Sequence, residues 1–195
     1  MPRTPRPLLD GAIYHVFNRG NGRMDLFAEE SDYRFFLKKL HEAKIKFGVT
    51  LNHYCLMSNH YHLLVQIVKG ENLSRFMHYL QMNYAHYFGK KYNFSGHVFG
   101  QRYRSPIIPK ESYYLQCGRY IERNPVKAGL AGKAEDYPYS SAKFYSLGRA
   151  DALITPNIYY EGLGRTESER QTTYKEFLEM EDPYAEIISE ALEKN

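Results

Sequence analysis

The segment MSNHYHLL, residues 57–64, places two histidines on either side of a tyrosine in a run that otherwise predicts a buried strand. Side chains alternate along a strand, so His60 and His62 should share one face while Tyr61 points to the other. Two neutral imidazoles on one face can bind the same metal ion. A lone His-X-His pattern recurs often by chance, however, and two half-exposed histidines, each bonded to a neighbour, would explain it without a metal. A third ligand from elsewhere in the chain is therefore needed to favour a metal site.

A predicted helix over residues 110–124 offers that ligand. Tyr120 and Asn124 are four residues apart and share a face of this helix. One amide oxygen and two imidazoles leave coordination positions open, which suits Mg²⁺ or Mn²⁺ with water and a substrate phosphate, whereas a closed zinc site needs another protein ligand. The Tyr120 hydroxyl could then attack a phosphate that the metal polarises. Tyr113 and Gln116 lie near the same face and remain the local alternatives.

Hydrophobic periodicity predicts the elements that position these residues. In chain order they are a strand at 12–20, a helix from Ser31 that ends at Gly48, strands at 49–59 and 60–68, a helix over 73–88, a broken strand at 97–108 and a helix over 110–123 that ends before Pro125. This β-α-β-β-α-β order predicts an α+β fold of the ferredoxin-like or RRM-like type. We expect an antiparallel sheet with helices on one face and the other face available for a ligand.

Charge is unevenly distributed along the chain. Residues 150–195 contain 11 acidic and 4 basic side chains, so the chain totals of 22 and 26 leave 11 acidic and 22 basic ones in residues 1–149. A basic body with an acidic tail favours a polyanionic partner, although an ordinary solvated surface also explains charge alone. We expect one or two surface helices within residues 166–194.

The cysteine content and the hydropathy indicate a cytoplasmic protein that makes no contact with a membrane. Cys55 and Cys117 form neither a disulfide framework nor a zinc-binding spacing. No apolar run approaches the roughly 18 residues of a membrane span, and the N-terminal sequence has no signal-peptide core.

Basic and aromatic side chains around the predicted site could contact nucleic acid, because cations bind phosphates and aromatic rings stack on unpaired bases. The DNA-binding candidates are Asn18, Arg19 and Arg23 at a glycine-rich turn, whose backbone could approach a base, and the cations Lys90, Lys91, Arg102, Arg104, Arg119 and Arg123. The stacking candidates are Tyr14, Phe17, Tyr103 and Tyr113. Core or surface placement explains any one of them equally well. As a set they favour nucleic acid.

Several ordered motifs resemble one family. NHYHLL resembles the HUH motif (His, bulky hydrophobic, His) of single-tyrosine transposases, and RYIERNPVKAGL resembles their tyrosine helix. Together with YHVFNRGNGR, FGQRYRS and YPYSSAKFY, they resemble the REP-associated tyrosine transposases in particular, over residues 8–147. We therefore expect an HUH transposase domain at 1–147 and an acidic, mostly helical extension at 148–195. The resemblance does not extend to the acidic end, residues 150–195. The middle HUH residue, Tyr61, is more amphipathic than the usual hydrophobe.

The resemblance implies an RRM-like fold and metal-dependent cleavage of single-stranded DNA beside a hairpin. It implies that His60, His62 and Asn124 are the ligands of Mg²⁺ or Mn²⁺ and that Tyr120 is the nucleophile. The tyrosine would form a 5′-phosphotyrosine and release a 3′-hydroxyl, which can later reverse the step and rejoin the strand. The energy stays in the phosphotyrosine bond, so no nucleotide cofactor is needed.

Two other functions remain open at this point. An RRM-like binding module would use the HUH strand only as a platform, and a metal-dependent nuclease would activate water and leave no protein–DNA adduct. We also expect a monomer, because the extension after Gly129 could cover the surface that a partner would use.

Overall fold

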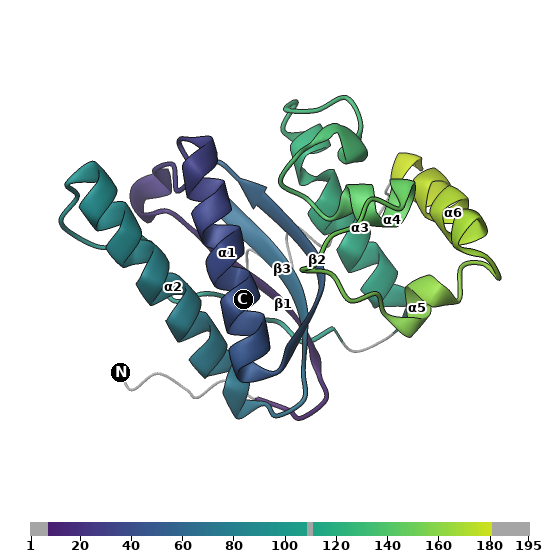
Figure 1. Cartoon of the computed structure of the whole chain (residues 1–195), viewed down its shortest axis with the longest axis horizontal. Helices are drawn as coiled ribbons and strands as arrows, with labels where there is room; N and C mark the ends of the chain where they lie inside the picture. Colours follow the sequence, from purple (N-terminus) through teal and green to yellow (C-terminus); the bar gives the residue numbers. More distant parts are fainter. Residues whose placement is uncertain (1–7, 109–110, 181–195) are drawn as a thin grey trace.

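A three-stranded antiparallel sheet lies at the centre of the protein (Figure 1). The computed structural model describes residues 8–108 and 111–180 of the chain. The strands are β1 (Ile13–Arg19), β2 (Val49–Met57) and β3 (His60–Ile67), in the spatial order β1-β3-β2. The turn between β2 and β3 consists of Ser58 and Asn59, as the sequence predicts. The HUH segment is therefore the start of the central strand.

Two long helices cover one face of the sheet, α1 (Glu30–Phe47) and α2 (Glu71–Tyr92) (Figure 1). Tyr61, Leu63 and Val65 of β3 point into this core and are fully buried. Gly48 ends α1 in the left-handed conformation, with φ of 60°, which a residue without a Cβ adopts at little cost. The α+β fold with an antiparallel sheet is confirmed.

The third long helix, α3 (Glu111–Lys127), lies on the opposite face of the sheet (Figure 1). Its buried side chains Tyr114, Cys117 and Ile121 pack with Cys55 of β2 and Leu64 of β3 in a second core. The face that was expected to stay available for a ligand is thus partly covered by the helix that carries Tyr120.

The prediction of a strand at 97–108 is wrong, because the segment forms no continuous strand. This segment runs along the outer edge of β1 and forms only isolated bridges, such as Phe17 with Arg104 and Tyr14 with Ile107. The His15 backbone N–H donates to the Pro106 carbonyl oxygen, but proline has no N–H to donate in return. The ladder is interrupted there, although the edge of β1 is still covered.

The predicted end of α3 before Pro125 is also wrong, because the helix continues to Lys127 with Pro125 inside it. Proline leaves the carbonyl of the residue four positions earlier, Ile121, without its usual donor. The side-chain amide nitrogen of Asn124 donates to that carbonyl at 3.2 Å and to the Tyr120 carbonyl at 2.8 Å. This replacement donor allows the helix to pass through the proline.

Shorter elements complete the described chain. They are η1 (Asn21–Arg23), η2 (Ala134–Asp136), α4 (Ala142–Leu147), α5 (Ile158–Glu161) and α6 (Glu167–Glu179). The helix expected within residues 166–194 is α6, which buries Tyr174 and Leu178 and so is more than a surface helix. The rest of that expected helical segment, from 181 onward, lies outside the described residues. No described helix has the length and apolar character needed to cross a membrane. The domain boundary at 147/148 stays a prediction.

Candidate metal and nucleophile site

The two histidines of the HUH segment lie on the face of the sheet that α3 covers. Their ring centroids are 5.1 Å apart, and the rings are perpendicular. His62 is only 5% exposed, and His60 is partly buried at the start of β3. Strand alternation therefore places the pair as the sequence predicts, with Tyr61 buried on the other face.

His60 contacts two side-chain amides. Its Nδ1 lies 2.6 Å from the Asn59 Oδ1, and it also forms a hydrogen bond with Asn124. Burial, followed by the neighbouring positive charge of Arg19, lowers the pKa of His60 to about 4. The imidazole is thus neutral at physiological pH, as a metal ligand must be.

Asn124 is oriented by the proline that follows it. Both hydrogens of its amide nitrogen are used by the carbonyls of Tyr120 and Ile121, so its amide oxygen is the atom left for His60. A neutral His60 carries one N–H and cannot donate to both the Asn59 and the Asn124 oxygens. A cation held between a ring nitrogen and the Asn124 oxygen would remove this conflict.

His62 is hydrogen-bonded to a third histidine, His15 of β1. The His15 Nε2 and the His62 Nδ1 are 2.9 Å apart. Burial lowers the pKa of His15 to about 3, and burial followed by the neighbouring His15 lowers that of His62 well below its usual value. Both rings are therefore neutral, and the Nε2 of His62 is the nitrogen that stays available.

Tyr120 packs against this histidine pair from α3. Its ring centroid lies 5.8 Å from that of His62 and 6.0 Å from that of His15, edge-on in both cases. The Lys127 ammonium lies 5.0 Å from the centre of the Tyr120 ring. Tyr120 is 8% exposed. The structure thus brings together the predicted nucleophile and the three predicted ligands.

The donor set fits Mg²⁺ or Mn²⁺. It comprises two neutral imidazoles and one amide oxygen, and Mn²⁺ accepts such mixed nitrogen and oxygen ligands. Within residues 8–108 and 111–180, no cluster of three or more His, Cys, Asp or Glu side chains could hold a metal ion. A site here therefore depends on Asn124, with the other positions left to water and substrate.

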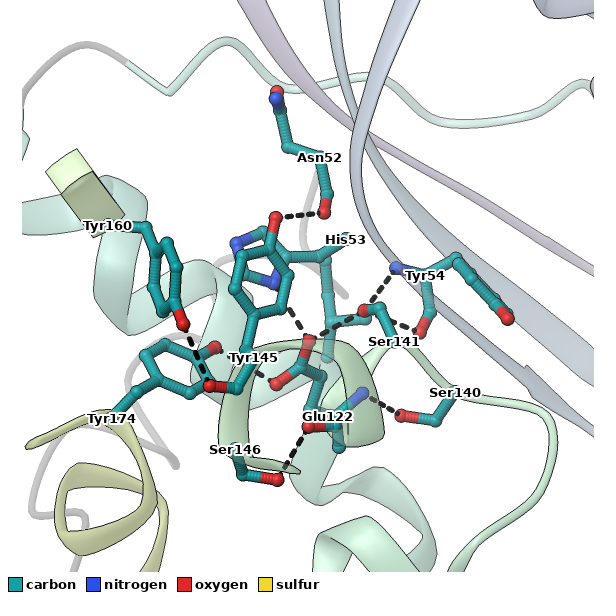
Figure 2. A network of polar contacts seen from close by, with 12 residues as sticks. Asn52, His53, Tyr54, Glu122, Ser140, Ser141, Tyr145, Ser146, Tyr160 and Tyr174 are labelled. Atoms are coloured by element: carbon teal, nitrogen blue, oxygen red, sulfur yellow. Dashed lines mark hydrogen bonds and ion pairs between the residues drawn. The ribbon is translucent and has the colours of Figure 1, made fainter. Parts of the chain in front are cut away.

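A buried polar network fixes α3 to the rest of the protein (Figure 2). Glu122, two residues after Tyr120, is fully buried and accepts hydrogen bonds from Ser141 at 2.6 Å and from Tyr174 of α6 at 2.9 Å. The Nδ1 of His53, on β2, lies 2.9 Å from the same carboxylate. Because a buried carboxylate is costly unless it is hydrogen-bonded, these partners restrict where α3 can sit.

Close packing reinforces this position. A Cβ on Gly118 of α3 would lie 2.8 Å from the His53 ring, so only glycine lets helix and strand approach this closely.

Some of the predicted DNA-binding residues lie beside the site. Arg19 lies opposite His60 in the pairing of β1 with β3. Arg104 forms an isolated β-bridge with Phe17, and the ring of Phe17 lies 5.6 Å from that of His62. Arg23 and Arg102 are exposed, on η1 and on the segment that runs along β1. Asn18 is 6% exposed and donates to the Gln101 carbonyl, which gives it a structural contact.

Other predicted contacts lie on α2 and α3. Lys90 and Lys91 are in the last turn of α2, where Lys91 forms ion pairs with Glu29 and Asp32. Arg119 is 2% exposed, and its guanidinium lies over the Phe177 ring of α6 at 5.0 Å. The Arg123 guanidinium donates to the Leu178 carbonyl. These arginines attach α3 to α6.

The aromatic candidates divide in the same way. Tyr14 is fully buried and Tyr103 is 8% exposed, so neither offers a ring face to a base. Phe17 is partly exposed beside His62, and Tyr113 is 55% exposed on α3. The stacking prediction is therefore wrong for Tyr14 and Tyr103.

Sequence reasoning missed His15, Asn59 and Glu122. The signal for His15 was present, because an imidazole in the apolar strand segment IYHVF lies on the same face as Phe17. Asn59 was assigned only to the turn. Glu122 had no signal, since its partners come from three distant parts of the chain.

The comparisons with known proteins identify the family. The family model described as "Transposase IS200 like" matches residues 9–124, which is more than half of the chain. The chain therefore belongs to the IS200-like transposase family. No curated protein matches it in sequence.

Solved structures are similar to this chain. A REP-associated tyrosine transposase bound to a REP hairpin is similar to this chain with a TM-score of 0.64 and 18% sequence identity, covering 81% of this chain and 93% of the other. A putative transposase from Deinococcus radiodurans is similar with a TM-score of 0.44 and 16% identity, covering 63% and 97% respectively. The first of these likenesses confirms the fold.

Proposed function

We propose that this member of a transposase family cleaves single-stranded DNA beside a hairpin, with Mg²⁺ or Mn²⁺ as cofactor, through a covalent phosphotyrosine. The observation that carries the proposal is the meeting of Tyr120 with His62, at 5.8 Å between ring centroids, while Asn124 contacts His60 one helical turn away. A nucleophile beside a set of neutral metal ligands matches the needs of phosphoryl transfer.

His60, His62 and Asn124 would hold the metal ion, which supplies Lewis-acid polarisation of the scissile phosphate. The Tyr120 oxygen forms a bond to phosphorus, and the bond from phosphorus to the 3′-oxygen breaks. The tyrosine loses its proton, and the 3′-oxygen leaves with one as a hydroxyl. The product is a 5′-phosphotyrosine. When a 3′-hydroxyl attacks its phosphorus, the bond to the tyrosine oxygen breaks, the tyrosine regains a proton and the strand is rejoined.

The basic residues beside the site support a DNA substrate. Arg19 is exposed next to His60, and Arg23 and Arg102 are exposed nearby in the fold, where they could bind the phosphates that flank the cleaved bond. A related transposase was solved with a REP hairpin. We propose a substrate of the same chemical class here, a hairpin-forming strand with single-stranded flanks.

Tyr120→Phe tests the nucleophile. A labelled single strand with a hairpin and flanking bases is incubated with protein and Mn²⁺ and run on a denaturing protein gel. The wild type should give a labelled, protease-sensitive band at the mass of the protein, and Tyr120→Phe should give none, because the attacking atom is gone. Tyr113→Phe, on the same helix but 55% exposed, is the matched control and should give the band.

The same gel separates the alternatives. Cleavage by the wild type without any adduct would favour a nuclease that activates water. Hairpin binding without cleavage in Mg²⁺ or Mn²⁺ would favour a binding module. An adduct with Tyr120→Phe would assign the nucleophile to another tyrosine.

A further inference from the structure

His15 occupies a position of β1 where an aliphatic side chain would pack more easily. It is fully buried, and its neighbours Tyr14 and Val16 belong to the apolar core on the other face. A buried imidazole loses its hydration and needs hydrogen bonds in return. Its Nε2 lies 2.9 Å from the His62 Nδ1, whereas its own Nδ1 has no hydrogen-bond partner among the residues the structure describes. The contact with His62 is thus what this imidazole provides.

One hydrogen lies between the two rings. Whether it is bonded to His15 or to His62 decides whether the Nε2 of His62 can bind a metal ion. A neutral imidazole carries a hydrogen on one nitrogen and a lone pair on the other. If His62 holds the hydrogen on Nδ1, its Nε2 has a free lone pair. If His15 donates instead, the hydrogen of His62 is on Nε2, and that nitrogen cannot bind a metal ion.

We propose that His15 is a positioning residue that accepts the Nδ1 hydrogen of His62 and so holds the Nε2 of His62 as a metal-binding atom. This inference rests on the proposed metal site. The ring centroids of His15 and His62 are 5.1 Å apart and the planes differ by 30°, so the contact also fixes the ring orientation. Partners that set the tautomer of a metal-binding histidine in this way raise its affinity for the ion.

The other HUH histidine is held in a parallel way. The Nδ1 of His60 lies 2.6 Å from the Asn59 Oδ1, and an amide oxygen can only accept. The tautomer of His60 is therefore set by the chemistry of its partner. At His62 the partner is His15, whose ring can either donate or accept. A side chain at position 15 with an oxygen that can only accept should therefore hold the same tautomer of His62.

Two substitutions separate this role from simple packing. His15→Phe keeps a planar ring but removes the acceptor, and His15→Gln supplies an amide oxygen that can accept. Tyr14→Phe is the matched control, because it removes a buried hydroxyl from the same strand on the opposite face. Thermal unfolding of each variant shows which ones are folded.

The first measurement is titration of Mn²⁺ by calorimetry into the full-length protein without DNA. We expect His15→Phe to bind Mn²⁺ about 10- to 100-fold more weakly than the wild type, the usual effect of losing such a partner. His15→Gln should retain most of the affinity, and Tyr14→Phe should bind as the wild type does. Wild-type affinity in a folded His15→Phe would overturn the proposal.

The second measurement is imidazole ¹⁵N NMR of the metal-free protein, which reports the tautomer of His62 directly. The wild type and His15→Gln should carry the hydrogen on Nδ1, and His15→Phe should lose this preference. A hydrogen on Nε2 in the wild type would overturn the proposal even if His15→Phe did not fold. If the folded wild type bound no Mn²⁺, the proposed metal site would fail, and the tautomer would still decide the role of His15.

Discussion

His60 and His62 each place their Nδ1 against a protein partner, Asn59 and His15 respectively, so the Nε2 of each ring is the atom that would bind an ion. Metal binding is therefore the first property to measure on single residues. The double substitution His60→Ala/His62→Ala should abolish Mn²⁺ binding in calorimetry, because it removes both imidazole ligands. DNA cleavage should stop with EDTA, while hairpin binding largely survives, because phosphate contacts do not need the ion.

His41→Ala/His78→Ala is the control for this experiment, since both histidines are exposed on α1 and α2. Equal Mn²⁺ affinity in the wild type and the His60/His62 variant would remove the site from this strand.

The site was largely predictable at this scale, and the reasons are local. Strand alternation fixes the shared face of His60 and His62, and helical spacing fixes that of Tyr120 and Asn124. Glu122 depends on contacts between segments far apart in the chain, and no periodicity encodes them. The arginines of α3 show the converse, since Arg119 and Arg123 have the charge expected of DNA contacts but serve as contacts to α6.

At the scale of the elements, the close approach of α3 to β2 overrides helix propensity. Alanine is favoured over glycine inside a helix by about 1 kcal/mol. At Gly118 the added Cβ would lie 2.8 Å from the His53 ring, which is buried and held by Glu122. Gly118→Ala should therefore lower the free energy of unfolding by about 1–3 kcal/mol, the usual cost of overpacking.

Urea unfolding tests this prediction, with Gly132→Ala as the control because its Cβ would meet no atom within 4 Å. A Gly118→Ala protein as stable as the wild type would show that α3 can shift without cost.

The stability of the contact between α1 and α2 should depend on pH. Asp32 is fully buried in the first turn of α1 and forms an ion pair with Lys91 at 2.6 Å. Burial acts to raise the pKa of the Asp32 carboxyl, but hydrogen bonds, first from Lys91 and then from Tyr92, outweigh burial and lower it. Its stabilisation is therefore fully present above the ordinary carboxyl pKa of about 3.9 and is lost as the pH falls through the lower value in the folded protein.

Asp32→Asn should thus lower the free energy of unfolding at pH 7 by on the order of 2 kcal/mol, the usual worth of hydrogen bonds to a charged group. The difference from the wild type should shrink below the ordinary carboxyl pKa, because the wild-type carboxyl loses its charge there. Asp25→Asn, at an exposed position, is the control. A difference that stays constant from pH 7 to pH 2 would contradict this account.

At the element scale the two wrong sequence predictions both involve proline. Pro106 interrupts the edge ladder of β1, and Pro125 lies inside α3 because Asn124 replaces its missing donor. The local rule for proline was right in each case about the lost hydrogen bond. The rule could not say which group takes part in the hydrogen bonding around each proline. That group is the strand β1 beside Pro106 and the side chain of Asn124 beside Pro125.

At the scale of the whole molecule, we propose that the protein is a monomer. The outer edge of β1 is bonded by residues 100–108, as in the pair Arg104 and Phe17, and the outer edge of β2 is bonded by Tyr139 and Thr155. Both sheet edges are thereby occupied within the chain itself, and edge pairing between two copies is blocked. Light scattering at micromolar concentration should give the monomer mass, and a stable dimer would contradict this prediction.

The segments that cover the two sheet edges also matter while the protein is being synthesised. The hairpin of β2 and β3 and its neighbour β1 emerge from the ribosome before residues 98–108, and well before residues 139–155. Until then the nascent sheet exposes unpaired N–H and C=O groups along both sides, which makes such a chain prone to aggregate. A pause in translation that leaves the chain emerged only to the end of α2 would thus be hazardous, whereas a chain emerged beyond residue 160 has both sides of the sheet already protected.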